Sequence, residues 1–81
     1  IHCSFPEQVQ ATADRYYRGR DDIVLLRVDP DRPDADVVVE EARSGDRFPH
    51  VYGPIPVEAV TSAEPVPMGP DGRLDLSWFS G

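Results

Sequence analysis

The side chains best suited to chemistry in this sequence are its two histidines, His2 and His50, and the aromatic residues near the second. Residues 48–56 hold three prolines, which fix φ, remove amide donors and push the preceding residues toward extended conformations. Because side chains alternate sides in an extended chain, Phe48, His50 and Tyr52 are expected to share one side. Such a segment suits a stiff binding wall or a well-packed loop, and we expect it to make a poor central strand.

A metal site and a nucleophilic cysteine are both less well supported by the sequence than a binding role for the histidines. His2, Cys3 and His50 have zinc-binding side chains, but neighbouring residues of a strand point to opposite faces, so His2 and Cys3 are not expected to share one ion. We therefore predict no metal site. Cys3 precedes a predicted helix whose dipole would favour a thiolate, yet a small buried residue on the core face is the favoured interpretation.

Two acidic residues, Glu40 and Glu41, end a predicted strand beside a turn. The favoured interpretation is a solvated strand end, and the sharper alternative is a catalytic carboxylate. Catalysis would need such a group within hydrogen-bond reach of a site histidine, so a glutamate close to His50 would favour an enzyme over a binding module. The sequence alone names no catalytic residue.

Composition bounds the class of protein. The 81 residues predict a single small domain over 1–81, with 72–81 as a C-terminal tail, either a last strand or a docked segment. A net charge of −7, with the eight basic residues scattered, argues against nucleic-acid binding, which needs a basic stripe. The apolar runs are too short for a membrane helix, and a single cysteine fits a cytoplasmic location.

The order of the predicted elements indicates an α+β fold with one main helix on a mainly antiparallel, bent sheet. A capping box of Ser4 and Glu7 with Pro6 in the first turn predicts a helix over 5–18, ended by Gly19. The apolar run 23–28 is expected to be a central strand covered on both faces. Further predicted elements are a strand at 37–41, a helical turn at 57–60 and an edge strand at 60–66.

Two stretches taken together resemble the bacterial domain-of-unknown-function family 952. The first comprises Ile1-His2-Cys3-Ser4, Arg15-Tyr16-Tyr17-Arg18-Gly19, Asp22-Ile23-Val24-Leu25-Leu26 and Asp29-Pro30, and the second is Phe48-Pro49-His50-Val51-Tyr52-Gly53-Pro54-Ile55-Pro56. The resemblance extends to about Gly72. This family is similar to the ADP-ribosyltransferase superfamily, whose members bind NAD in a cleft between two small sheets.

That resemblance implies NAD or another nucleotide as ligand and leaves open whether the domain is an enzyme. It implies that His2 and His50 line one cleft with Tyr52 nearby, and that Phe48 and Ser4 also belong to the cofactor-binding set. An imidazole can hydrogen-bond ribose hydroxyls, and an aromatic ring can stack on nicotinamide or adenine. The alternatives are a binding module without chemistry and a partial gene product.

Family members begin further upstream, with a strand and a helix that this sequence lacks. The expectation is therefore a chain truncated at its N-terminus, with an exposed sheet edge or apolar patch near residues 1–3. Exposed edges pair with other chains, so a homodimer or self-association is expected.

Overall fold

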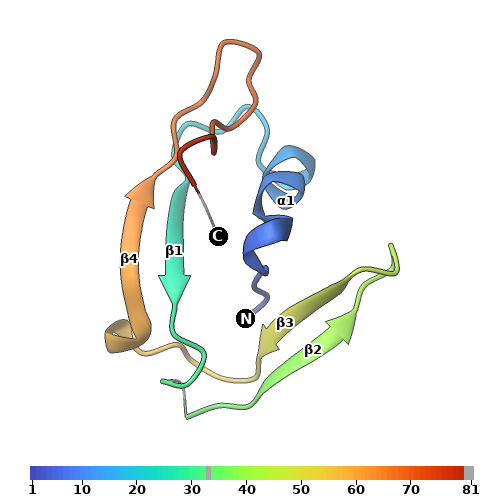
Figure 1. Cartoon of the computed structure of the whole chain (residues 1–81), viewed down its shortest axis with the longest axis vertical. Helices are drawn as coiled ribbons and strands as arrows, with labels where there is room; N and C mark the ends of the chain where they lie inside the picture. The colour runs from blue at the N-terminus through green and yellow to red at the C-terminus, as the bar shows by residue number, and fades with distance from the viewer. Residues whose placement is uncertain (33, 80–81) are drawn as a thin grey trace.

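Two short antiparallel sheets and a helix make up the architecture of the computed structural model, which describes residues 1–32 and 34–79 (Figure 1). Strand β1 pairs with β4, and β2 pairs with β3. The α+β class and the antiparallel pairing are as predicted, but the expected single bent sheet is wrong because the strands form two separate pairs. The elements in order are η1 (Pro6–Gln8), α1 (Val9–Tyr16), β1 (Val24–Val28), β2 (Val37–Glu41), β3 (Arg47–Val51), η2 (Val57–Ala59) and β4 (Val60–Pro65).

The helical segment begins one residue later than the predicted capping box requires. Pro6 opens a 3₁₀ turn, as expected for a residue without an amide hydrogen, and Phe5 rather than Ser4 is its N-cap. The side chain of Gln8, not that of Glu7, reaches back: its Oε1 accepts the Phe5 amide at 2.9 Å. One orphan amide is thus satisfied by a side chain three residues on, as in a capping box shifted by one residue.

The helix ends at Tyr16, two residues before the predicted end, with Tyr17 as its C-cap. Gly19 lies in the turn that follows, where the Arg20 amide donates to the Tyr17 carbonyl, and is not the residue that ends the helix. Gly19 adopts φ +83°, a left-handed conformation that glycine reaches without steric cost. Its amide donates to the carbonyl of Gly72 at 2.7 Å, so the end of the helical segment is tied to a turn 53 positions further along the chain.

Strand β3 is flanked on both sides, although its Phe-Pro-His sequence predicted a poor central strand. On one side it pairs with β2; on the other, the amide of Val51 donates to the carbonyl of Ile1 at 2.8 Å, and that of Cys3 donates to Pro49 at 2.9 Å. In an antiparallel strand a residue's amide and carbonyl face the same neighbour. The missing donor of Pro49 therefore faces the N-terminal residues, and the ladder to β2 keeps its hydrogen bonds.

Strand β1 was expected to be central, and this is wrong. It pairs only with β4, and Val24 and Leu26 on its outer face are each 52% exposed. The opposite side, with Ile23 and Leu25, packs on the core. A continuous apolar run therefore marks a half-buried strand here, because no second layer covers its outer face within the described part of the chain.

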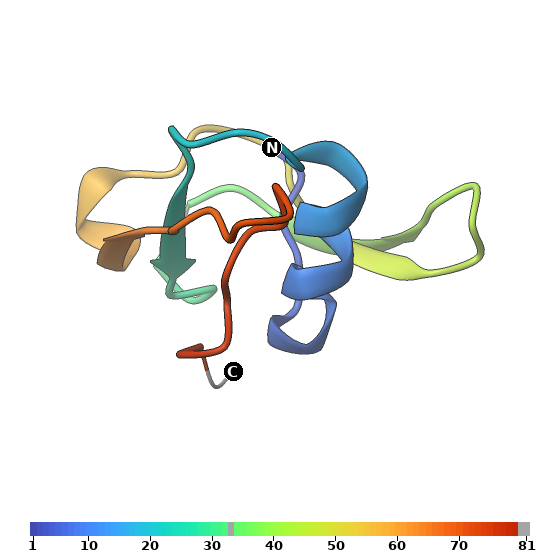
Figure 2. The same ribbon diagram turned by 90° about the horizontal axis from the view of Figure 1, so that it is seen from above.

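The hydrophobic core is built around the C-terminal segment. In both views this segment lies between β1 and α1 (Figures 1 and 2), and its Leu74 and Leu76 are only 2% and 6% exposed. Residues 72–79 are thus a docked segment rather than a last strand, and positions 80 and 81 lie outside the described residues. The core cluster consists of Ala13, Val66, Leu74 and Leu76, with Val9, Ile23, Leu25 and Phe79 packed against it.

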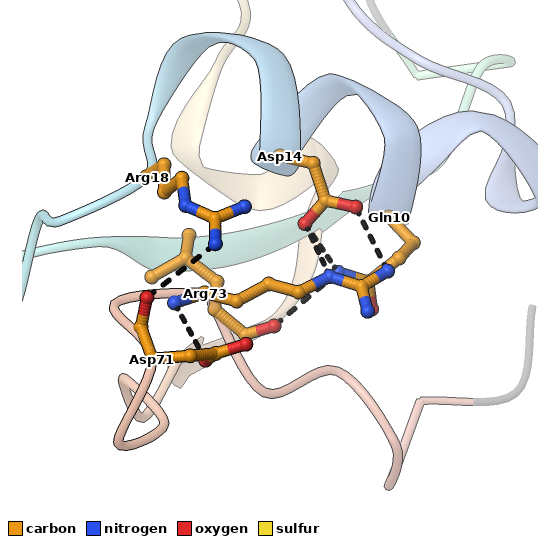
Figure 3. Close-up of polar contacts among 6 residues, drawn as sticks. Gln10, Asp14, Arg18, Asp71 and Arg73 are labelled. Atoms are coloured by element: carbon orange, nitrogen blue, oxygen red, sulfur yellow. Dashed lines mark hydrogen bonds and ion pairs between the residues drawn. The ribbon is translucent and has the colours of Figure 1, made fainter.

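A polar contact holds the same segment on the helix (Figure 3). Arg73 donates from Nε and Nη2 to the two carboxylate oxygens of Asp14, each at 2.9 Å. Gln10 donates to the same carboxylate at 3.0 Å and to the Leu74 carbonyl at 3.3 Å. One helix face therefore positions the segment that completes the core.

No helix within residues 1–32 and 34–79 is long and apolar enough to cross a membrane.

Candidate functional site

Three rings stack on one face of the β2–β3 sheet. The imidazole of His2 lies 4.1 Å from that of His50, centroid to centroid, with the planes tilted by 40°. On the other side of His50, the ring of Tyr52 lies 4.2 Å away and is nearly parallel, at 14°. The predicted meeting of the two histidines is confirmed, and His50 is the middle ring.

The register of the strands produces this stack. His2 and His50 face each other across an antiparallel bridge, between the bonded positions Ile1–Val51 and Cys3–Pro49. Such a non-hydrogen-bonded pair brings side chains closest together. Tyr52 follows His50 by two positions, so its ring returns to the same face, as the alternation predicted.

Glu40 joins the stack from β2. Its Oε1 lies 2.7 Å from Nδ1 of His50, and its Oε2 accepts the hydroxyl hydrogen of Tyr52. The favoured interpretation of this residue as a solvated strand end holds only in part, because its side chain is 42% exposed but is bonded to His50 and Tyr52. Glu41 is exposed, as expected. The missed signal is the hairpin register: Glu40 and Phe48 are equally distant from Ser44 in the turn, and they pair directly.

These contacts set the charge of the site. The hydrogen bond from Tyr52, followed by the contact with His50, lowers the pKa of Glu40 below its usual value. The same hydrogen bond to the carboxylate, together with burial, raises the pKa of Tyr52. At neutral pH the site therefore holds an ionised carboxylate and a neutral phenol.

The carboxylate also fixes the orientation of His50. An ionised carboxylate is an acceptor only, so Nδ1 must carry the hydrogen. In the neutral ring the lone pair then lies on Nε2. The His50 side chain is 19% exposed, held between two more exposed rings.

The other predicted site residues lie in different surroundings. Phe48 is half-buried and opposite Glu40. The hydroxyl of Ser4 is 3.3 Å from that of Thr12 on α1, so its hydrogen bond goes to the helix rather than to the ring stack. Cys3 is a half-buried free thiol. Among residues 1–32 and 34–79, no group of three His, Cys, Asp or Glu side chains could hold a metal ion.

The cleft expected beside the histidines does not coincide with either of two open hollows found among the described residues. One hollow is lined by Pro6, Glu7, Gln10, Leu76 and Phe79. The other is lined by Gln10 of α1, by residues 69–71 and by residues 73–77. Neither includes a member of the ring stack. The stack instead presents the exposed rings of His2 and Tyr52, which is 52% exposed, on a sheet face.

Comparison with known proteins identifies the family. No curated protein matches the chain significantly. The crystal structure of protein CC0527 from Caulobacter crescentus superposes with a TM-score of 0.85 at 39% identity, over 95% of this chain and 68% of that one. A double mutant of the same protein gives a TM-score of 0.84 at 39% identity, with the same coverage. The family model for "Protein of unknown function (DUF952)" matches residues 1–63, and the chain therefore belongs to the DUF952 family.

Proposed function

We propose that this domain binds NAD⁺ or a related nicotinamide nucleotide on the face formed by His2, His50, Tyr52 and Glu40. The observation that carries the proposal is the three-ring stack with a carboxylate bonded to two of its members. The two small sheets are consistent with the ADP-ribosyltransferase-like resemblance, which supplies the nucleotide class.

The chemistry of the face favours the nicotinamide end of the ligand. The outer rings of the stack offer π-faces on which a planar heterocycle can lie. The oxidised nicotinamide ring is cationic, so it gains from an aromatic face and from the neighbouring charge of Glu40. The same carboxylate repels phosphate, and the net charge of −7 adds to this repulsion. The pyrophosphate is therefore expected to point away from the stack.

The alternative is a binding module without chemistry. A carboxylate within hydrogen-bond reach of His50 is the feature expected of an enzyme and not of a binding module. The contact between Glu40 and His50 therefore favours a site that can transfer protons. An open sheet face buries less of a ligand than a pocket does, so an affinity of about 1 mM is expected in either case.

The test is an NMR titration of the labelled protein with NAD⁺, NADH and ATP. We expect NAD⁺ to shift the resonances of His2, His50 and Tyr52 at millimolar concentration, and to do so more strongly than NADH, whose nicotinamide ring is neutral. Tyr52→Ala should weaken the shifts, whereas Tyr16→Ala on α1, where Tyr16 is 67% exposed, is the matched control. Equal shifts for all three nucleotides, or none at several millimolar, would contradict the proposal.

A further inference from the structure

We propose that the free edge of β2 pairs with the same edge of a second copy of this chain, across a two-fold axis at Val39. The two β2–β3 hairpins then form one four-stranded antiparallel sheet. This inference does not depend on the proposed nucleotide binding. It also concerns a different surface from residues 1–3, where self-association was predicted, because the amide of Cys3 and the carbonyl of Ile1 bond to β3.

Strand β2 has one paired edge and one free edge. At the end of its ladder with β3, the Ala42 amide donates to the Asp46 carbonyl at 2.8 Å, so positions 38, 40 and 42 face β3. The backbone groups of positions 37, 39 and 41 therefore point away from β3. Within residues 1–32 and 34–79, no strand pairs with this second edge. In Figure 1 β2 lies on the outside of the molecule, and in Figure 2 its hairpin extends beyond α1, so the edge is open to a partner.

The free edge of β2 has all its backbone donors, whereas the outer edge of β4 does not. On β4, the missing donor of Pro65 faces away from β1, because the next amide, that of Val66, bonds to Ile23. Such a proline blocks pairing at an edge. Strand β2 reads Val-Val-Val-Glu-Glu, without proline, glycine or lysine, and its three valines are 39%, 43% and 45% exposed. A β-branched edge with every donor present favours pairing with another strand.

The charge pattern of β2 fits a second copy in one register. With the axis at Val39, each glutamate of one copy lies opposite a valine of the other, position 41 opposite 37 and position 40 opposite 38. Positions 37, 39 and 41 then meet as hydrogen-bonded pairs, so each free donor of the strand finds an acceptor. An axis at position 38 would instead place Glu40 opposite Asp36, and like charges directly opposite are destabilising. Because the acidic residues occupy only one end of β2, the strand is complementary to its own antiparallel copy.

The pairing also determines how the two ring stacks lie. Opposite residues of paired strands project to the same side of the sheet, so the two copies of the His50 stack lie on one side of the four-stranded sheet. The interface is small, and a dissociation constant of about 0.1–1 mM is expected. Each copy carries a net charge of −7, so salt should strengthen the association by screening the repulsion between the copies.

The first experiment measures association of the whole chain and locates its surface. Sedimentation equilibrium from micromolar to millimolar protein should show a monomer–dimer equilibrium that shifts toward dimer as salt is raised. Hydrogen exchange over the same range should show the amides at positions 37, 39 and 41 gaining protection with concentration, while the amide of Ala63 on the outer edge of β4 gains none. Protection at 37 and 39 without protection at 41 would overturn the register.

The second experiment removes one donor from the edge. Val39→Pro deletes an amide hydrogen that points away from β3 and leaves the ladder intact, because Val39 and Pro49 are a non-hydrogen-bonded pair. Two hydrogen bonds are lost per dimer, so association should weaken by about tenfold or more. Ala63→Pro is the matched control on the outer edge of β4, and it should leave association unchanged.

A third variant keeps the test decisive if proline disturbs the fold. Val39→Lys retains the amide but places two positive charges opposite each other at the axis, so it should also weaken association. Val57→Lys, at a side chain of η2 that is 85% exposed, changes the net charge equally and should dimerise as the wild type does.

Three outcomes would overturn the proposal: equal dimerisation of the two lysine variants, a wild type that stays monomeric at millimolar concentration, and association that weakens as salt is raised. Protection of positions 37, 39 and 41 only after addition of a basic, valine-rich peptide would also refute the second copy, and would identify an extended peptide as the partner of β2.

Discussion

Asp14 on α1 and Arg73 near the C-terminus form a bidentate ion pair across 59 positions of the chain, with both contacts at 2.9 Å. The pair joins the helix to the segment that carries the core residues Leu74 and Leu76. The hydrogen bonds from Arg73 lower the pKa of Asp14, so the stabilisation is present above the unfolded pKa and is lost as pH falls through the lower folded pKa.

Arg73→Ala should lower the melting temperature by about 2–6 °C, a modest effect because exposed ion pairs are screened by water and salt. Arg20→Ala is the matched control, since Arg20 makes a similar pair with Asp22 only two positions away and joins no distant segments. The difference between the two variants, measured by thermal unfolding, should shrink in high salt. An equal effect of both substitutions would mean that the link between segments adds nothing.

Leu74→Ala should destabilise the domain by about 2–5 kcal/mol, because it leaves a cavity where the side chain is 2% exposed. A chain of this size has a free energy of unfolding of about 4–12 kcal/mol, so a large share of the stability would be lost. Leu26→Ala makes the same change at a side chain that is 52% exposed and should cost far less. Urea unfolding of both variants is the measurement, and similar midpoints would contradict the assigned core.

The contact between Glu40 and Tyr52 predicts two pH effects of opposite sign. The pKa of Glu40 is lowered, so its stabilising contribution is full above the unfolded pKa and fades as pH falls through the folded pKa. The pKa of Tyr52 is raised, so its contribution is full below the unfolded pKa and is lost as pH rises through the folded pKa.

Ultraviolet titration of tyrosine ionisation checks the second effect. Comparison of wild type with Tyr52→Phe isolates Tyr52 from the other tyrosines, Tyr16 and Tyr17. Glu40→Gln should shift ionisation of Tyr52 back toward lower pH. If ionisation of Tyr52 did not respond to Glu40→Gln, the phenol would not be bonded to the carboxylate in solution.

Gly53, which follows Tyr52, should not tolerate alanine. A Cβ there would lie 2.6 Å from the Cβ of Ala35, and the φ of +155° disfavours a side chain. We expect Gly53→Ala to destabilise by about 1–3 kcal/mol, the usual effect of overpacking. Adding Ala35→Gly should recover part of the loss, so the two changes should be non-additive in a double-mutant cycle. Additive effects would place the strain elsewhere.

Local patterns predicted the elements better than their arrangement. The period-2 alternation correctly placed Phe48, His50 and Tyr52 on one face, because that rule depends on the extended backbone alone. The exposure of β1 was not predictable in this way, since burial of Val24 and Leu26 depends on whether another layer covers them. The same applies to the position of β3 between two neighbours, which depends on where residues 1–3 return in the fold.

The candidate site, like the fold, was only partly predictable from the sequence. The proximity of His2 and His50 came from the family resemblance, because 48 positions of sequence impose no contact by themselves. The role of Glu40 was within reach of sequence reasoning, since the hairpin turn fixes its partner. The pairing of Asp14 with Arg73 had no local signal, because it joins a helix to a segment without regular structure.

The late position of Leu74 and Leu76 in the chain has a consequence for biosynthesis. During translation, α1 and β1 leave the ribosome long before the leucines that fill the space between them. Until then Ile23 and Leu25 have no partners from the C-terminal segment, and the nascent chain exposes apolar surface that chaperones recognise. Folding of this domain is therefore expected to wait until Leu74 and Leu76 have left the ribosome, and a ribosome stalled before Leu74 should hold a chain that proteases readily digest.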